Sequence, residues 1–199
     1  MKLGTQLATD RVTDALSHTD RVRYFCGLAR EFETVGEYEA ACEALADFWP
    51  NRSGNPMVDG LDDEEKAEVL LRVGAVSGWL GSAHSAGGQE HAKDLLTQSI
   101  EIFKQQGRTA RVGEVQSELA LCYWREGGFD EARVNLDQAL ECVKDEDFDL
   151  KASILIRFSV VERRAGCFHE ALKRLAVASL RTRWMNHSPA KCSCIQTRQ

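Results

Sequence analysis

The sequence predicts an all-α protein, an α-solenoid of about four antiparallel helix pairs. The 199-residue chain contains only three prolines, and no strand-like alternation of apolar and polar residues extends beyond a few positions. Apolar residues instead recur at helical spacing, and glycines divide the stripes into pairs. The alanines that follow these breaks are separated by 51, 40 and 39 residues, which indicates an irregular repeat. They are Ala41, Ala92, Ala132 and Ala171.

Composition indicates a soluble, folded protein, because hydrophobic residues make up 43% of the chain and charged residues 28%. No apolar run approaches the length of a membrane span, and the start of the chain lacks the apolar stretch of a signal peptide. The seven cysteines are an odd number, and most lie in helical stripes. We therefore expect a cytoplasmic protein with reduced thiols packed in its core and no membrane partner.

Charge is distributed unevenly along the chain. Residues 1–150 carry 15 Lys and Arg against 29 Asp and Glu, whereas residues 151–199 carry 10 against 2. A basic end can contact phosphates, but the acidic body and the pI near 5.4 disfavour nucleic acid as the partner. Attraction between the basic end and the chain's own acidic body is the simpler interpretation.

The first helix pair is expected over residues 20–49, after a lead-in over 1–19 that includes a short helix at 9–17. Thr19 or Asp20 is expected to cap the first helix of the pair by accepting bonds from its free N–H groups. Gly36 then breaks the apolar pattern. The stripe of the second helix extends from Tyr38 to Phe48.

The second pair is expected over residues 62–106, after a loop at 50–60 that is rich in Pro, Gly and Asn. Asp62 and Glu65 have the spacing of a capping box, in which each side chain accepts a bond from the other residue's backbone N–H. They predict the start of a long helix that ends near residue 84. The segment after residue 88 supplies its antiparallel partner.

Inside that long helix, Gly74 and Gly78 have the spacing found where membrane helices dimerise. Arg72 and the acidic start of the helix argue against a membrane span. The spacing therefore indicates close packing on a neighbouring helix.

The third and fourth pairs, over 109–143 and 148–182, have the most regular pattern. In the third pair the Gly127-Gly128 step separates the two helices. Alanines on both helices allow their backbones to approach closely. After about residue 183 the helical stripe stops, so residues 184–199 are expected to be a disordered tail.

The stretch 116–143 resembles a tetratricopeptide repeat (TPR), whose helix pair has small residues at the helix contacts and large apolar residues between them. The small residues here are Ala120, Gly127, Ala132 and Ala139. The resemblance extends over roughly residues 20–180, and the lengthened first helix of the second pair is similar to those of longer bacterial TPR arrays. It implies a right-handed superhelix whose inner groove, lined by the first helix of each pair, binds a peptide or protein segment.

One TPR subgroup binds the C-terminal carboxylate of chaperones through Lys and Asn in the groove. The matching places of the first pair hold Cys26 and Arg30, so this clamp is absent. The resemblance therefore disfavours a chaperone-tail role, and Arg30 is kept only as a candidate groove residue.

No set of residues points to catalysis, a cofactor or a metal. The chain has no P-loop, no dinucleotide-binding glycine run, no HExxH and no GxSxG. A zinc site at His187, Cys192 and Cys194 is disfavoured, because the Cys-x-Cys step is shorter than structural zinc spacing and no second cysteine pair follows. His84 and His91 flank a turn, where surface histidines are commoner than metal ligands. We expect a protein that is not an enzyme.

The expected binding site is a patch near the ends of the first helices of the third and fourth pairs. Projected on the TPR pattern, its groove-facing residues are Trp124, Arg125, Arg163 and Arg164. Trp79 is expected to extend the patch. A Trp beside several guanidinium groups suits an acidic segment with an aromatic or aliphatic anchor. In the alternative interpretation Trp124 is core and the arginines pair with nearby acids, which are Glu126, Glu162 and those at 145–149.

The leading hypothesis is thus a cytoplasmic scaffold or adaptor that binds a protein segment in its groove. The alternative is a sensor or regulatory module of a bacterial signalling or transcription system, which recognises a peptide or a small effector. The last pair has no polar capping helix after it, so this end is also a candidate for self-association.

Overall fold

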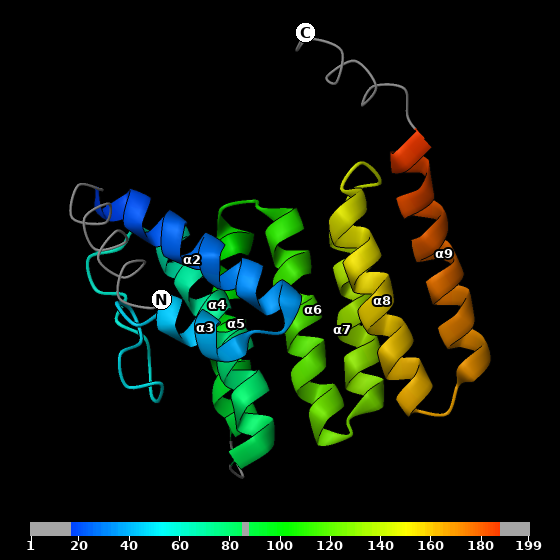
Figure 1. Cartoon of the computed structure of the whole chain (residues 1–199), viewed down its shortest axis with the longest axis horizontal. Coiled ribbons are helices and arrows are strands. Elements are labelled where there is room, and N and C mark those ends of the chain that lie inside the picture. The colour runs from blue at the N-terminus through cyan, green and yellow to red at the C-terminus, as the bar shows by residue number, and fades with distance from the viewer. Residues whose placement is uncertain (1–16, 85–87, 188–199) are drawn as a thin grey trace, which may run out of the picture. The chain divides into compact units, whose positions relative to one another are not determined.

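The computed structural model describes residues 17–84 and 88–187 and is all-α in these ranges (Figure 1). Consecutive helices pack as sequential antiparallel pairs, which confirms the predicted fold class. The helices are α2 (His18–Val35), α3 (Tyr38–Ala44), α4 (Asp63–His84), α5 (Gly88–Gln105), α6 (Thr109–Glu126), α7 (Phe129–Cys142), α8 (Phe148–Arg164) and α9 (Phe168–His187).

The chain divides into two compact units, which are described separately. Unit 1, within residues 1–106, contains α2 to α5, and unit 2, within residues 107–199, contains α6 to α9. None of the described helices combines the length and apolarity needed to cross a bilayer. The expected helix at 9–17 lies almost wholly outside the described residues, and so do Cys192 and Cys194 of the expected tail.

The start of α2 differs from the sequence prediction. Ser17, rather than Thr19 or Asp20, is the N-cap, because its extended backbone lets its hydroxyl oxygen accept a bond from the Asp20 N–H at 3.2 Å. The hydroxyl also donates to the Asp20 carboxylate at 2.6 Å. The helix ends as predicted at Gly36, whose φ of 83° is accessible to glycine at little cost.

The second helix of the first pair is shorter than its apolar stripe predicts. The stripe extends to Phe48, whereas α3 ends at Ala44. Beyond it the chain turns into the loop predicted at 50–60. Hydrogen bonds hold this loop in place. The Met57 N–H donates to the Phe48 carbonyl at 2.7 Å, and the Trp49 indole N–H donates to the Gly54 carbonyl at 3.0 Å. Phe48 is therefore a core residue that follows α3 and does not belong to it.

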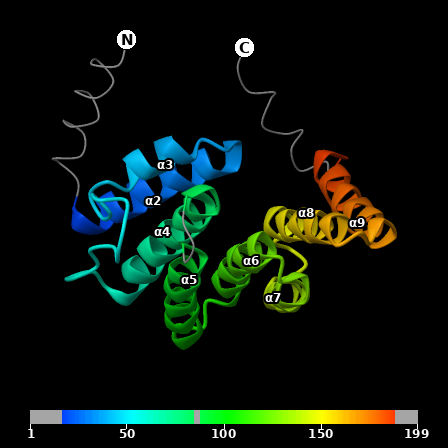
Figure 2. The same cartoon turned by 90° about the horizontal axis from the view of Figure 1, so that it is seen from below.

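The helix α4 begins with the predicted capping box. The Glu65 N–H donates to the Asp62 carboxylate at 2.8 Å, and the Asp62 N–H donates to the Glu65 carboxylate at 3.2 Å. Figure 2 shows α4 between α5 on one side and the α2/α3 pair on the other, so most of its middle is buried.

Gly74 marks the close approach of α4 to α5. A Cβ atom built on Gly74 would lie 2.9 Å from the Leu96 side chain and 3.4 Å from the Ala92 carbonyl oxygen. The glycine spacing in the long helix thus corresponds to tight helix packing within unit 1, as the sequence indicates.

Unit 2 has a core of small and branched side chains. Its buried cluster comprises Ala120, Ala132, Leu136, Ala139, Val143, Ile154, Phe158 and Val161. Ala132 and Ala171, the alanines that follow the helix breaks, are both buried. The α9 helix continues to His187, beyond the end of the last pair that the sequence predicts.

Candidate functional site

The candidate site lies where α6 and α8, the first helices of the two pairs in unit 2, run side by side. We call it the α6–α8 face and define it by Glu118, Trp124 and Arg125 of α6 and Arg157, Arg163 and Arg164 of α8. Besides hydrophobic packing, two contacts of arginine side chains connect the described parts of these helices along this face. Arg157 and Arg164 are seven residues apart, so the contacts are separated by about 10 Å along α8.

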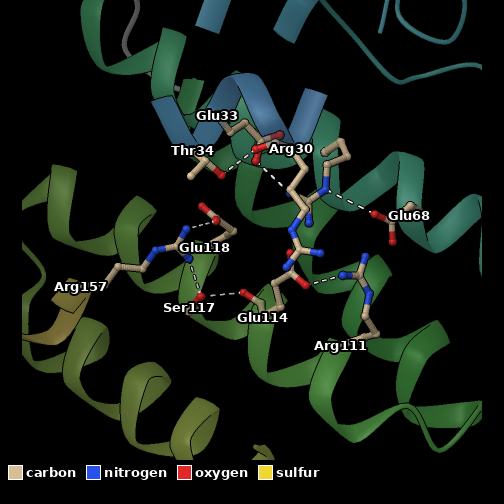
Figure 3. A network of polar contacts seen from close by, with 10 residues as sticks. Arg30, Glu33, Thr34, Glu68, Arg111, Glu114, Ser117, Glu118 and Arg157 are labelled. Atoms are coloured by element: carbon tan, nitrogen blue, oxygen red, sulfur yellow. Dashed lines mark hydrogen bonds and ion pairs between the residues drawn. The ribbon is translucent and has the colours of Figure 1, made fainter. Parts of the chain in front are cut away.

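The first contact is a polar network around Arg157 (Figure 3). The Arg157 guanidinium donates to the Ser117 hydroxyl and to the Glu118 carboxylate on α6. Ser117 in turn donates to the Glu114 carbonyl at 2.8 Å, and the Glu114 carboxylate forms an ion pair with Arg111. Because Glu118 and Ser117 are buried, this network fixes the position of α8 against α6.

The second contact is formed by Arg164 and Trp124. The Arg164 guanidinium carbon lies 6.0 Å from the centroid of the Trp124 ring, at the limit of a cation–π contact. Trp124 is half-buried and packs against the hydrophobic cluster of unit 2. Its indole N–H is buried and has no hydrogen-bond partner among the described residues. Trp124 therefore belongs partly to the core and partly to the face.

The other two predicted arginines lie beside this contact. Arg163 is exposed on α8, next to Arg164, and Arg125 is half-buried on α6, next to Trp124. Apolar side chains complete the surface of α8, because Ile156 is exposed and Val160 is half-buried. These two residues precede Arg163 by seven and three positions, which places all three on one side of the helix.

Two of the acids that the alternative interpretation assigns to these arginines contact other cations. Glu162 accepts two bonds of 2.9 Å from Arg133 of α7, and this contact holds the pKa of the Glu162 carboxyl below its ordinary value. Asp145 lies 2.6 Å from Lys151. Glu162 is therefore engaged by Arg133 and not by the arginines that the alternative interpretation assigns to it. For Glu126 and the acids at 145–149 that interpretation stays a prediction.

Trp79 and Arg30 belong to unit 1, and the α6–α8 face is defined without them. Trp79 stacks on Tyr38 of α3, with ring centroids 4.3 Å apart and planes inclined by 19°. Arg30 is exposed on α2, where its backbone carbonyl accepts a bond of 2.8 Å from the Thr34 hydroxyl.

Sequence reasoning missed the contact between Arg157 and Glu118. The spacing contains a signal, because both residues lie about two helical turns before the predicted patch on their own helices. By sequence alone Arg157 is one of the ten basic residues at 151–199. Within the described residues, no group of three or more His, Cys, Asp or Glu side chains could hold a metal ion.

No protein-family model and no curated protein matches the sequence. Solved structures do match. The structure of BtubC (BKLC) from P. vanneervenii aligns with a TM-score of 0.59 and 20% identity, covering 84% of this chain and 65% of that one. The structure of MamA aligns with a TM-score of 0.51 and 17% identity, covering 94% and 99% of the two chains.

A putative kinesin light chain of Podosopora anserina, described as having nearly identical TPR-like repeats, aligns at 20% identity and a lower TM-score of 0.44, covering 87% of this chain and 100% of that one. At such identities the comparisons establish the fold alone, and the structural neighbours are TPR-like repeat proteins. The chain spans 65% of the length of the BtubC chain that it matches.

Proposed function

We propose that this protein, whose fold is that of TPR-like repeats, is an interaction scaffold that binds an acidic segment of a partner protein along the α6–α8 face. TPR-like folds are generally protein-interaction modules, which supports a binding role. The observation that carries the choice of face is the contact of Arg164 with Trp124, beside an exposed Arg163.

The chemistry of the face favours an acidic ligand with an apolar anchor. Guanidinium groups bind carboxylates through two parallel N–H donors, and such charge-assisted bonds are stronger than neutral ones. The half-buried Trp124 ring and the exposed Ile156 side chain offer apolar surface on either helix. An acidic segment with one aromatic or aliphatic residue could use both kinds of contact, as interface anchors commonly do.

The α6–α8 face favours binding over catalysis. Its polar groups are used to connect α6 and α8, because Arg157 is engaged by Ser117 and Glu118. The exposed side chains of Arg163 and Arg164 and the half-buried Trp124 ring are cationic and aromatic, which suits recognition of a ligand and provides no paired nucleophile and base. We therefore propose a role in holding a partner.

The proposal is tested by titrating the protein with a labelled acidic peptide that carries one Phe, and with the same peptide in which every Asp and Glu is replaced by Asn and Gln. The acidic peptide should bind and the amide peptide should bind more weakly. Arg163→Glu/Arg164→Glu and Trp124→Ala should each weaken binding by about tenfold or more.

The matched control is Arg23→Glu/Lys144→Glu, which changes the net charge equally at two exposed cations that are not among the residues defining this face. Its affinity should stay within about twofold of the wild type if binding depends on these particular side chains, whereas a response to net charge alone would weaken binding equally in the control. Circular dichroism establishes that each variant is folded. Equal affinity in the wild type and both site variants would overturn the proposal.

A further inference from the structure

The exposed side of α8 changes in charge from one end of the helix to the other. Asp149, Ile156 and Arg163 are spaced by seven residues, which is about two helical turns, so they lie on one side of α8. Asp149 lies in the first turn and Arg163 in the last, and both are exposed. Ile156, between them, is 47% exposed. This side of the helix therefore carries an acid, an apolar side chain and a cation, in that order.

The acidic end of α8 consists of more than one side chain. Residues 144–149, which lead into the helix and form its start, carry four acids and one Lys. Lys151 follows, but it is half-buried and its ammonium group lies 2.6 Å from the Asp145 carboxylate. The chain around the first turn of α8 thus has a net negative charge, and it would repel a ligand carboxylate.

The middle of the α6–α8 face also disfavours a ligand carboxylate. Arg157 lies there, but its guanidinium donates to the Ser117 hydroxyl and to the Glu118 carboxylate of the chain itself (Figure 3). The side chains of Arg157 and Glu118 are 26% and 10% exposed. Because an internal acid already engages this arginine, the exposed cations at the end of α8, Arg163 and Arg164, are the better site for ligand carboxylates.

We propose that the partner segment is ordered in charge, with carboxylates at Arg163 and Arg164, an apolar residue at Ile156 and a cation at Asp149. This inference deepens the proposed function and rests on it, because it assumes that an acidic segment binds the α6–α8 face. It adds a cation at one end of that segment, which attraction to the arginines alone does not require. The charge order of the segment is thus complementary to that of α8.

The spacing along α8 matches that of an extended segment. Seven residues of an α-helix span about 10 Å. In a polyproline II segment every third residue lies on the same side, and three residues span about 9 Å. A segment of the form cation-x-x-apolar-x-x-acid can therefore contact Asp149, Ile156 and Arg163 at the same time. It needs no helix formation, which is unfavourable for a short isolated segment in water.

Two labelled peptides with blocked termini test the proposal by fluorescence anisotropy with the full-length protein. The ordered peptide is Lys-Pro-Pro-Leu-Pro-Pro-Asp-Asp, and the acidic peptide has Asp in place of Lys. The prolines favour the polyproline II conformation in both, so the peptides differ only in the charge at one end. The ordered peptide should bind about fivefold more tightly, because one exposed attraction replaces one repulsion. Attraction to the arginines alone would instead favour the acidic peptide, which is more negative.

Asp149→Lys should remove or invert this preference. The matched control is Glu141→Lys, which changes the net charge equally. Glu141 is exposed on α7, nine residues after the buried Ala132 and hence on the opposite side of that helix. The control should keep the ratio of the two affinities within about twofold of the wild-type ratio. Because both peptides are measured on the same variant, a partial loss of folded protein affects them alike and leaves their ratio unchanged.

Equal affinity of the two peptides for the wild type, or tighter binding of the acidic peptide, would overturn this inference and leave the proposed function standing. A preference that Asp149→Lys leaves unchanged, or that Glu141→Lys also abolishes, would overturn it as well. If neither peptide binds although the acidic peptide with one Phe does, the spacing is wrong and this inference fails alone. If none of the three peptides binds, the proposed function fails with it.

Discussion

Arg72 is a charged side chain in the interior of unit 1, with an exposed fraction of 1%. Its guanidinium forms ion pairs with Glu33 of α2 at 2.9 Å and with Glu68 of α4 at 3.5 Å. A buried ion is costly to desolvate, and only close partners compensate for that cost. The Arg72–Glu33 pair therefore favours one orientation of α2 on α4, in which the two buried charges meet.

Arg72→Ala should lower the free energy of unfolding by about 3–5 kcal/mol, because it leaves the Glu33 carboxylate without its buried partner. Arg23→Ala is the control, since Arg23 is exposed and lies 3.9 Å from Asp20. It should cost less than about 1 kcal/mol. Denaturant titration measures both, and equal costs for the two variants would contradict a structural role for Arg72.

Glu162 gives unit 2 a predictable response to acid. The hydrogen bonds from Arg133 lower the pKa of its carboxyl below the ordinary value of 4.5. A carboxyl whose pKa is lower in the folded state contributes stability above its unfolded pKa and loses that contribution as pH falls through its folded pKa. The contact between α7 and α8 should therefore weaken only below about pH 4.5.

Glu162→Gln should destabilise the protein by about 1–3 kcal/mol at pH 7, because the charge-assisted bonds to Arg133 are lost. The difference from the wild type should stay constant down to about pH 4.5 and shrink below it, because the unfolded wild-type chain then binds a proton that the native Glu162 carboxyl takes up only at lower pH. Urea titrations at several pH values measure it. A difference that is independent of pH down to pH 3 would contradict this account.

At the scale of an element, α6 and α7 approach each other at Gly113. A Cβ atom built there would lie 2.8 Å from the Ala139 carbonyl oxygen and 2.8 Å from a Val143 methyl. A backbone oxygen cannot move aside as a flexible side chain can, so the separation of the two helices depends on the absence of a side chain at this position.

Gly113→Ala should lower the free energy of unfolding by about 1–3 kcal/mol, because the added methyl overpacks the contact. Gly27→Ala on α2 is the matched control, since nothing lies within 4 Å of its Cβ position. It should stabilise the protein by about 0.5–1 kcal/mol through helix propensity alone. The same sign of change in both variants would mean that α6 and α7 do not approach at Gly113.

At the scale of the whole molecule, each unit has its own hydrophobic core. Repeat proteins derive their stability from contacts within each repeat and from contacts between neighbouring repeats. Cutting the chain between two repeats should therefore cost less stability than cutting it within a repeat. The boundary between residues 106 and 107 falls between helix pairs. A cut between residues 126 and 127 instead separates α6 from α7 and divides the Ala120–Ala132 cluster.

Fragments 1–106 and 107–199 should therefore each give a helical circular dichroism spectrum and a cooperative melting transition. Fragment 127–199, which lacks α6, should lose its cooperative transition, because the inner side of α7 is then exposed. Cooperative melting of fragment 127–199 with the midpoint of fragment 107–199 would show that α6 contributes little to the core.

The sequence by itself determined the features that depend on neighbouring residues. Gly36 and Gly127 end helices, and Asp62 and Glu65 begin one. Ala132 is buried. Each of these features could be predicted, because it follows from helical periodicity or from groups only a few residues apart. The sequence did not predict that Ser17 caps α2, because Thr19 and Asp20 are also suitable capping residues. It did not predict the early end of α3, because the apolar stripe continues past Ala44 to Phe48.

Only the tertiary structure decided which distant charges meet and which apolar faces are covered. Arg157 binds Glu118, 39 residues away. Glu162 binds Arg133 of α7 and not its sequence neighbours Arg163 and Arg164. Such pairings depend on how two helices are rotated and shifted against each other, which no local pattern specifies. For the same reason the related positions Leu136 and Leu175 differ in exposure, since burial depends on whether another helix lies over them.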